Sequence, residues 1–227
     1  MSQNRIGLEI GGPSKVFRKK NILPVYACAA RIDNVNFASG TAWESGLSEG
    51  GDFIFNPGKP LGRQYLREAT RLTGLPDAAY DFVLSSHCLE HVANPLAALR
   101  EWWRVTCVGG HLILILPDPP STFDHRRPVT SLDHLLEDFT HSTTESDLTH
   151  LPEILNLHDL TRDPAAGSLD KFKARGLNNA ESRCLHHHVF DLELIRSVLD
   201  ETGWDVLEAE KVKPMHLVAL ARKRTVG

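Results

Sequence analysis

The chain has 227 residues, of which 41% are hydrophobic and 24% charged, and its formal net charge is −4. This length and composition predict one globular domain, residues 1–227, with a sizeable core and no membrane-spanning segment. The mildly acidic balance disfavours a nucleic-acid-binding surface. Four scattered cysteines without a C-x-x-C pair, and no signal peptide before the first expected strand, favour the reducing cytoplasm.

The first expected strand runs into a glycine-rich turn, within the segment Arg5–Ser14. Glycines at such a turn let the backbone approach a ligand and leave amide N–H groups free to meet negative charge. Because Pro13 follows Gly12, the fingerprint G-x-G-x-x-G is absent and an NAD-type cradle is disfavoured. Roughly 20 residues further on, Asp33 is placed either to bind ribose hydroxyls at the end of a second strand or to lie in a surface turn. Residues 68–72 are expected to form the next strand.

A complete βαβ unit follows, at residues 80–117. The apolar run 80–86 predicts a strand, and Asn94 and Pro95 supply an N-cap and a first-turn proline for a helix. Gly109–Gly110 is expected to end that helix before a second strand. Apolar side chains recur at helical spacing between these signals, at Leu96, Leu99 and Trp103.

The right-handed crossover of such a unit makes its two strands parallel neighbours in an open sheet. Ligands of these sheets bind beyond the carboxyl ends of the strands. The sequence therefore predicts a binding crevice beside Ser86, His87, Glu90 and the turn Pro117–Asp118.

Residues 119–185 are polar, rich in Asp and His, and interrupted by prolines. We interpret them as a helical insertion that forms either a lid over the crevice or a merely structural cap. After it, Asp191 is expected to cap a helix that ends at Gly203. Strands at 204–210 and 216–222 should close the sheet.

These motifs resemble the class I S-adenosylmethionine-dependent methyltransferases, in particular the methyltransferase type 11-like branch. The likeness runs through residues 80–119 and also includes Glu9–Gly12, Asp33 and Glu68–Ala69. It implies a Rossmann-like, doubly wound α/β fold with a mostly parallel seven-stranded sheet, an antiparallel last strand and a helical insertion after the fifth strand. It also implies S-adenosylmethionine as the cofactor.

The resemblance assigns the first motif to residues 9–13. Glu9 and Gly11 look like the acidic-x-glycine opening that faces the methionine part of the cofactor. Gly12 and Pro13 depart from the usual second glycine of this loop.

The resemblance also implies how the rest of the cofactor is held. Asp33 is similar to the ribose-binding acidic residue, since two carboxylate oxygens suit a vicinal diol. Glu68 and Ala69 look like the pair that meets adenine. Ser86 and His87 would lie near the methionine carboxylate and the sulfonium, or else pack at a helix start.

A competing motif is His87-Cys-Leu-Glu90-His91, which fits the H-x-x-E-H pattern of a family of zinc metallopeptidases. Such a zinc site needs both histidines on one face of an established helix. Here the helix-start signal at Asn94 comes after the motif, so a strand-to-helix turn is expected instead. No histidine pair in the insertion has dedicated zinc spacing, and no metal is predicted.

Two further groups could converge on a methyl acceptor. One follows the fifth strand and comprises Asp124, His125, Arg126 and Arg127; the other precedes the next helix and comprises His186, His187 and His188. His125 is the first choice of general base and His186 the second. The arginines suit an acidic acceptor, such as a sugar acid or nucleotide sugar, unless they form ordinary surface salt bridges.

The sequence thus predicts methyl transfer from S-adenosylmethionine to a small-molecule acceptor, without nucleic-acid or membrane partners. The altered Gly12–Pro13 loop motivates an alternative, a non-catalytic module that binds the cofactor or its product. A zinc metallopeptidase is the third interpretation.

Overall fold

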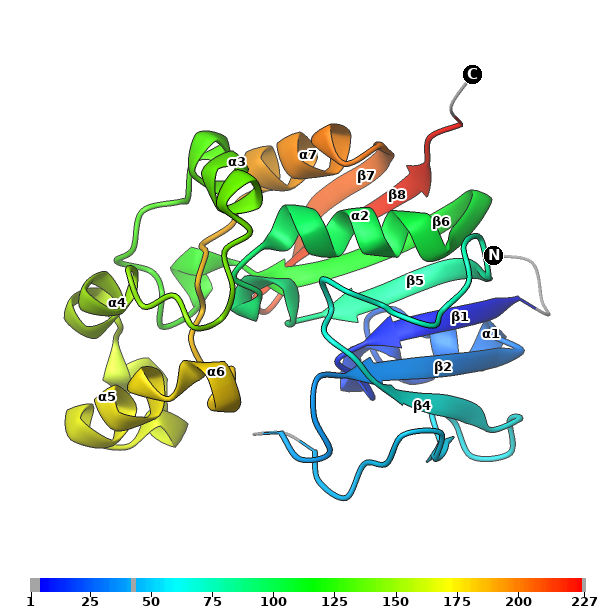
Figure 1. The fold of residues 1–227 in the computed structure, drawn as a ribbon, viewed down its shortest axis with the longest axis horizontal. Helices are drawn as coiled ribbons and strands as arrows, with labels where there is room; N and C mark the ends of the chain where they lie inside the picture. Colours follow the sequence, from blue (N-terminus) through cyan, green and yellow to red (C-terminus); the bar gives the residue numbers. More distant parts are fainter. Residues whose placement is uncertain (1–4, 42–43, 226–227) are drawn as a thin grey trace.

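The protein folds into an eight-stranded sheet with helices on both faces (Figure 1). This computed structural model describes residues 5–41 and 44–225. The strand order is β3-β4-β2-β1-β5-β6-β8-β7. The strands are β1 (Ile6–Ile10), β2 (Arg31–Asn36), β3 (Asp52–Phe53), β4 (Gly62–Leu66), β5 (Tyr80–Ser86), β6 (Thr106–Pro117), β7 (Trp204–Val212) and β8 (His216–Lys223).

Strands β4, β2, β1, β5 and β6 are parallel, and the last strand, β8, is antiparallel to β6 and to β7. The predicted Rossmann-like sheet is therefore confirmed. It has eight strands rather than seven because Asp52–Phe53 adds a short antiparallel edge strand beside β4.

Helices cover the two faces of the sheet unequally. The helices are α1 (Val25–Cys28), α2 (Pro95–Val105), α3 (Leu132–His141), α4 (Leu151–Leu157), α5 (Leu169–Leu177), α6 (Asn179–Ser182) and α7 (Leu192–Glu201), and the 3-10 turns are η1 (Lys15–Phe17), η2 (Leu89–His91), η3 (Pro119–Ser121), η4 (Leu160–Arg162) and η5 (Pro164–Ala166). Helices α2, α3 and α7 bury apolar side chains against one face, whereas α1 and η1 do so against the other. No described helix is long and apolar enough to cross a membrane.

The predicted βαβ unit is present, with one correction. Asn94 accepts a hydrogen bond from the backbone N–H of Ala97, and Pro95 is the first residue of α2. The helix ends at Val105, so Gly109–Gly110 is not its terminator. These glycines lie inside β6, in a bulge where the backbone approaches β5: a Cβ on Gly110 would lie 2.8 Å from Asp81 O.

The strand predicted at 68–72 is displaced. β4 begins at Gly62 and ends at Leu66, so Glu68 and Ala69 lie just beyond its carboxyl end. β4 has few apolar residues because it lies near the edge of the sheet, and this polarity hides it from a search for apolar runs.

Helices α3 to α6 lie within residues 119–185, as predicted for the insertion, and they gather at one end of the sheet (Figure 1). The insertion has a small apolar core of its own, formed by Leu151, Ile154, Ala166, Phe172 and Leu185. The predicted cap of α7 is confirmed, since Asp191 accepts a hydrogen bond from Leu194 N.

We expect Gly62→Ala to destabilise the fold strongly. A Cβ at this position would lie 1.7 Å from Ile32 O, and backbone on backbone cannot relax cheaply. Overpacking of this kind costs about 1–3 kcal/mol or more. Urea unfolding should show the loss, whereas Gly40→Ala, where a Cβ meets nothing within 4 Å, should change little. Equal stabilities of the two variants would contradict this packing.

Candidate functional site

A cavity of about 380 Å³ opens at the carboxyl ends of β1, β2, β4 and β5. Each of these strands contributes the loop that follows it, and the insertion contributes part of the wall. The lining residues include Gly11, Pro13, Ser14, Lys15, Asn36, Phe37, Glu68, Ala69, Ser86, His87, Cys88, His91, Glu145, Arg183 and His216. The crevice predicted from the sheet topology is therefore present.

The loop after β1 is held in place by hydrogen bonds to buried side chains. Gly11 has φ +79° and lines the cavity, as does Pro13. Glu9 is fully buried: it accepts a hydrogen bond from Ser14 N at 3.0 Å and another from the Tyr26 hydroxyl at 2.6 Å. Gly12 packs on Glu9 so closely that a Cβ would lie 2.3 Å from its carboxyl carbon. Glu9 and Gly12 thus shape the loop, and neither lines the cavity.

Burial raises the pKa of Glu9 from 4.5 to about 7, although its hydrogen bonds to Tyr26 and Ser14 oppose the shift. The desolvation of the charge is larger than the gain from these bonds. Glu9 thus supports the loop from the core, and its predicted contact with the methionine part of the cofactor stays a prediction.

Asp33 lies away from this cavity, in the middle of β2. Its carboxylate accepts hydrogen bonds from Arg63 N at 2.9 Å and from the Tyr80 hydroxyl at 3.1 Å. Asp33 therefore does not line this cavity, and its expected ribose contact stays a prediction. The residue that lines the cavity at the end of β2 is Asn36, three positions later, because the strand is longer than its apolar residues indicate.

Glu68 and Ala69 line the cavity, as expected for an adenine-binding pair. The Glu68 carboxylate is also held by both terminal nitrogens of Arg183, at 2.8 and 3.1 Å. Arg183 comes from the insertion and pairs with Glu145 at 3.0 Å as well. The insertion therefore reaches across the cavity to the core.

The end of β5 turns sharply at His87, whose φ is +51°. Its ring Nε2 lies 2.9 Å from His216 Nδ1, and both rings line the cavity. Burial, followed by the neighbouring His216 and His186, lowers the pKa of His87 to about 4. At neutral pH His87 is thus an uncharged imidazole at the cavity wall. Ser86 lies beside it in the lining.

The H-x-x-E-H segment is a strand end followed by the short turn η2, as predicted, rather than a helix. The His87 ring faces His216, whereas Glu90 and His91 approach His186. The three residues of the motif therefore do not share one helical face, which is the arrangement that a peptidase zinc site of this type requires.

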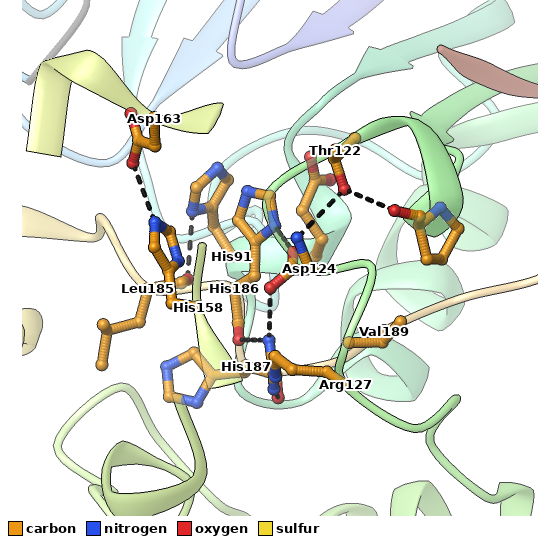
Figure 2. A network of polar contacts seen from close by, with 12 residues as sticks. His91, Thr122, Asp124, Arg127, His158, Asp163, Leu185, His186, His187 and Val189 are labelled. Atoms are coloured by element: carbon orange, nitrogen blue, oxygen red, sulfur yellow. Dashed lines mark hydrogen bonds and ion pairs between the residues drawn. The ribbon is translucent and has the colours of Figure 1, made fainter. Parts of the chain in front are cut away.

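Behind the cavity lies a buried polar network around Asp124 (Figure 2). The Asp124 carboxylate accepts hydrogen bonds from His186 Nδ1 at 2.5 Å and from Arg127 Nη1 at 3.1 Å. Burial alone would raise the pKa of Asp124, but the hydrogen bond and charge of His186, together with Arg127, hold it at about 2. Burial lowers the pKa of His186, yet the contact with Asp124 outweighs it and the net pKa is raised.

Glu90 has a different environment: it is buried, and neither carboxylate oxygen has a hydrogen-bond partner in the described part of the chain. Burial raises its pKa from 4.5 to about 7, against the opposing charge of His186. The folded protein keeps this proton at a pH where the unfolded chain has lost it.

We expect Glu90→Gln to remove a pH dependence of stability. Between about pH 4.5 and 7 the folded state binds more protons at Glu90, so the contribution of this residue to the free energy of unfolding falls as pH rises through this range and then levels off. The shift corresponds to a contribution on the order of 3 kcal/mol. Urea unfolding at pH 5 and pH 7.5 tests this. If the difference in stability between the wild type and Glu90→Gln were the same at both pH values, Glu90 would not contribute to the pH dependence.

The groups expected to bind the acceptor do not line the cavity. His125 lies 2.9 Å from Asp159, and the exposed Arg126 pairs with the same carboxylate at 3.2 Å. Asp124, Arg127 and His186 form the buried network described above. His187 contacts Asn179 at 2.9 Å, and His188 lies 3.2 Å from Ala93 O. Polar packing within the insertion thus accounts for most of these residues.

Asn36, Glu145, Arg183 and His216 are among the lining residues that were not predicted. His216 could have been found, because the first residue of an antiparallel final strand lies at the same edge as the carboxyl ends of its parallel neighbours; indeed His216 is paired with Pro117. No signal in the sequence indicates that Glu145 and Arg183 fold back onto Glu68.

Comparison with known proteins supports the same fold, and a family model matches part of the chain. Residues 56–114 match a family model described as a methyltransferase domain. The ajmaline N-methyltransferase of Rauvolfia serpentina is 30% identical over 110 residues, which are 48% of this chain and 34% of that enzyme. The match therefore spans about a third of the length of that relative.

Two solved structures share the fold over nearly the whole chain. A protein described as a candidate methyltransferase from Bacillus halodurans has a TM-score of 0.53 at 12% identity, covering 99% of this chain and 95% of its own. A SAM-dependent methyltransferase from Methanosarcina mazei has a TM-score of 0.53 at 14% identity, covering 99% and 94%. With the family match and the shared fold in agreement, the predicted resemblance to the class I S-adenosylmethionine-dependent methyltransferases is confirmed.

Proposed function

We propose that this protein transfers a methyl group from S-adenosylmethionine to a small-molecule acceptor. The observation that carries the proposal is the cavity into which the loops after four parallel strands converge. In this proposal the chain acts as one domain, with residues 119–185 as a lid, because Glu145 and Arg183 of the insertion line the same cavity as the core loops.

The lining residues fit the parts of this cofactor in chain order. Gly11 and Ser86 would meet the methionine part, with the backbone of the Gly11 loop close to its carboxylate. Asn36 would bind the ribose in place of the expected Asp33. Ala69 would contact adenine, and Glu68 would share its carboxylate between Arg183 and the exocyclic amine.

The bound cofactor supplies a methyl group on a sulfonium, and transfer is an in-line displacement whose rate depends on positioning. An acceptor hydroxyl must also lose a proton. Among the lining residues we assign His87 as this base. Its imidazole is unprotonated above about pH 4 and is oriented by His216. His87 thus takes the role of general base that was expected of His125. His186 belongs instead to the buried network around Asp124.

For the acceptor, we keep the class of acidic small molecules such as a sugar acid or nucleotide sugar. Arg126 and Arg127 no longer support it, because both are engaged within the insertion. The support now comes from Lys15, a cationic side chain at the cavity wall.

Calorimetric titration tests the cofactor site. S-adenosylmethionine and S-adenosylhomocysteine should each bind with one site per chain. Ala69→Trp should weaken binding by at least about tenfold, since the larger ring fills the cavity. Asp33→Asn is the matched control and should bind as the wild type does. Loss of binding in Asp33→Asn together with full binding in Ala69→Trp would place the cofactor elsewhere.

A further inference from the structure

A cluster of four potential metal ligands lies outside the cavity, in the insertion and in the segment that follows it. His134 and Asp138 are one turn apart on α3, His150 immediately precedes α4, and His188 lies between α6 and α7. Each offers one ligand atom, and these atoms all lie within 4.8 Å of one another. We name these four residues the lid cluster. Three separate segments of the chain have to fold together to form it.

The spacing within the lid cluster suits a small divalent ion. His134 Nε2 lies 2.9 Å from His150 Nε2 and 3.3 Å from Asp138 Oδ2. Nitrogen and oxygen ligands about 2.0–2.2 Å from a tetrahedral zinc are roughly 3.3–3.5 Å from each other. The observed distances are close to this value.

Two buried polar atoms of the lid cluster make no hydrogen bond within the described residues. Asp138 Oδ2 and His188 Nδ1 are buried and have no hydrogen-bond partner. Leaving such atoms unsatisfied is costly, and a bound cation would satisfy both. His188 is only 1% exposed, so solvent does not reach it instead.

One ring nitrogen of His188 is held by the backbone, as is common for metal-binding histidines. Its Nε2 lies 3.2 Å from Ala93 O, and because a carbonyl oxygen only accepts, Nε2 is the donor. In the neutral ring this leaves the lone pair on Nδ1. A backbone carbonyl that fixes the tautomer of a ligating histidine is a common supporting contact in metal sites.

We propose that the lid cluster binds one divalent transition-metal ion of the zinc class. Three imidazoles and one carboxylate favour zinc over magnesium or calcium, which prefer oxygen ligands. Four protein ligands leave no open position, so this is a structural site that joins α3, α4 and the segment before α7. It is independent of the cofactor and replaces the expectation that no metal is bound.

Metal analysis of untagged full-length protein tests the proposal. After loading with one equivalent of Zn²⁺ and dialysis, we expect one zinc per chain, and with Co²⁺ we expect the visible spectrum of a tetrahedral site. His150→Ala and the conservative Asp138→Asn should weaken zinc affinity at least about tenfold in competition with a chromophoric chelator. His141→Ala, on an exposed residue at the end of α3, should leave affinity unchanged.

Two results would overturn the proposal. One is a folded wild-type protein that retains no zinc after loading. The other is zinc that is lost in Glu90→Gln but retained in His150→Ala and Asp138→Asn, because the ion would then occupy the group formed by Glu90, His91 and His186. Circular dichroism of each variant confirms that it is folded.

Discussion

His87→Ala should lower the turnover number of methyl transfer to a hydroxyl acceptor by roughly 10²–10⁴, which is the usual loss when a general base is removed. The affinity for S-adenosylmethionine should change little, because the backbone at this position remains. His87 lines the cavity at the end of β5, and its side chain is 30% exposed. Its pKa of about 4 keeps the imidazole unprotonated at neutral pH.

His125→Ala is the matched control for this experiment. His125 lies against Asp159 and does not line the cavity, so its removal should leave turnover and cofactor affinity close to wild type. Steady-state kinetics at saturating acceptor, with calorimetry of the cofactor, separates the two effects. A large loss of turnover in His125→Ala with none in His87→Ala would restore His125 as the base.

Arg127→Ala should produce the largest loss of stability, about 3–5 kcal/mol, as is typical when one partner of a buried ion pair is removed. The Arg127 side chain is 1% exposed and pairs with Asp124 at 3.1 Å and Glu153 at 2.9 Å. It also donates to the backbone carbonyls of His186 and His187. Its removal therefore loosens the insertion and leaves buried acceptors unsatisfied.

The neighbouring Arg126 provides the control for Arg127. Its side chain is 53% exposed and pairs with Asp159, and exposed ion pairs contribute little to stability. Urea unfolding should therefore show a small change for Arg126→Ala and a large one for Arg127→Ala. Similar stabilities of the two variants would contradict the role assigned to the buried guanidinium.

The elements of the sheet core could be predicted because each has a local signal. Asn94–Pro95 marks the start of α2, Asp191 caps α7, and the apolar run at 80–86 is β5. The sequence mispredicted the elements whose position is determined by tertiary contacts. Gly109–Gly110 looks like a helix terminator but lies in a bulge of β6, and β4 is too polar to be recognised.

The candidate site was predicted best where backbone topology alone determines position. Gly11, Ala69 and His87 follow strand ends and line the cavity. His125 and Arg126 also follow a strand end, but Asp159 of the insertion holds them elsewhere. The way in which an insertion folds back depends on long-range pairs between polar residues, and a single sequence contains no local signal for such pairs.

Following a labelled methyl group tests most directly whether the protein catalyses methyl transfer to a small molecule. Protein is incubated with methyl-labelled S-adenosylmethionine and an extract of small metabolites, and the label is measured in the small-molecule and protein fractions. We predict a labelled small molecule together with S-adenosylhomocysteine, both greatly reduced in Ala69→Trp and in His87→Ala. Cofactor that binds with one site per chain but gives no labelled product from any extract would contradict catalysis and favour the non-catalytic binding module.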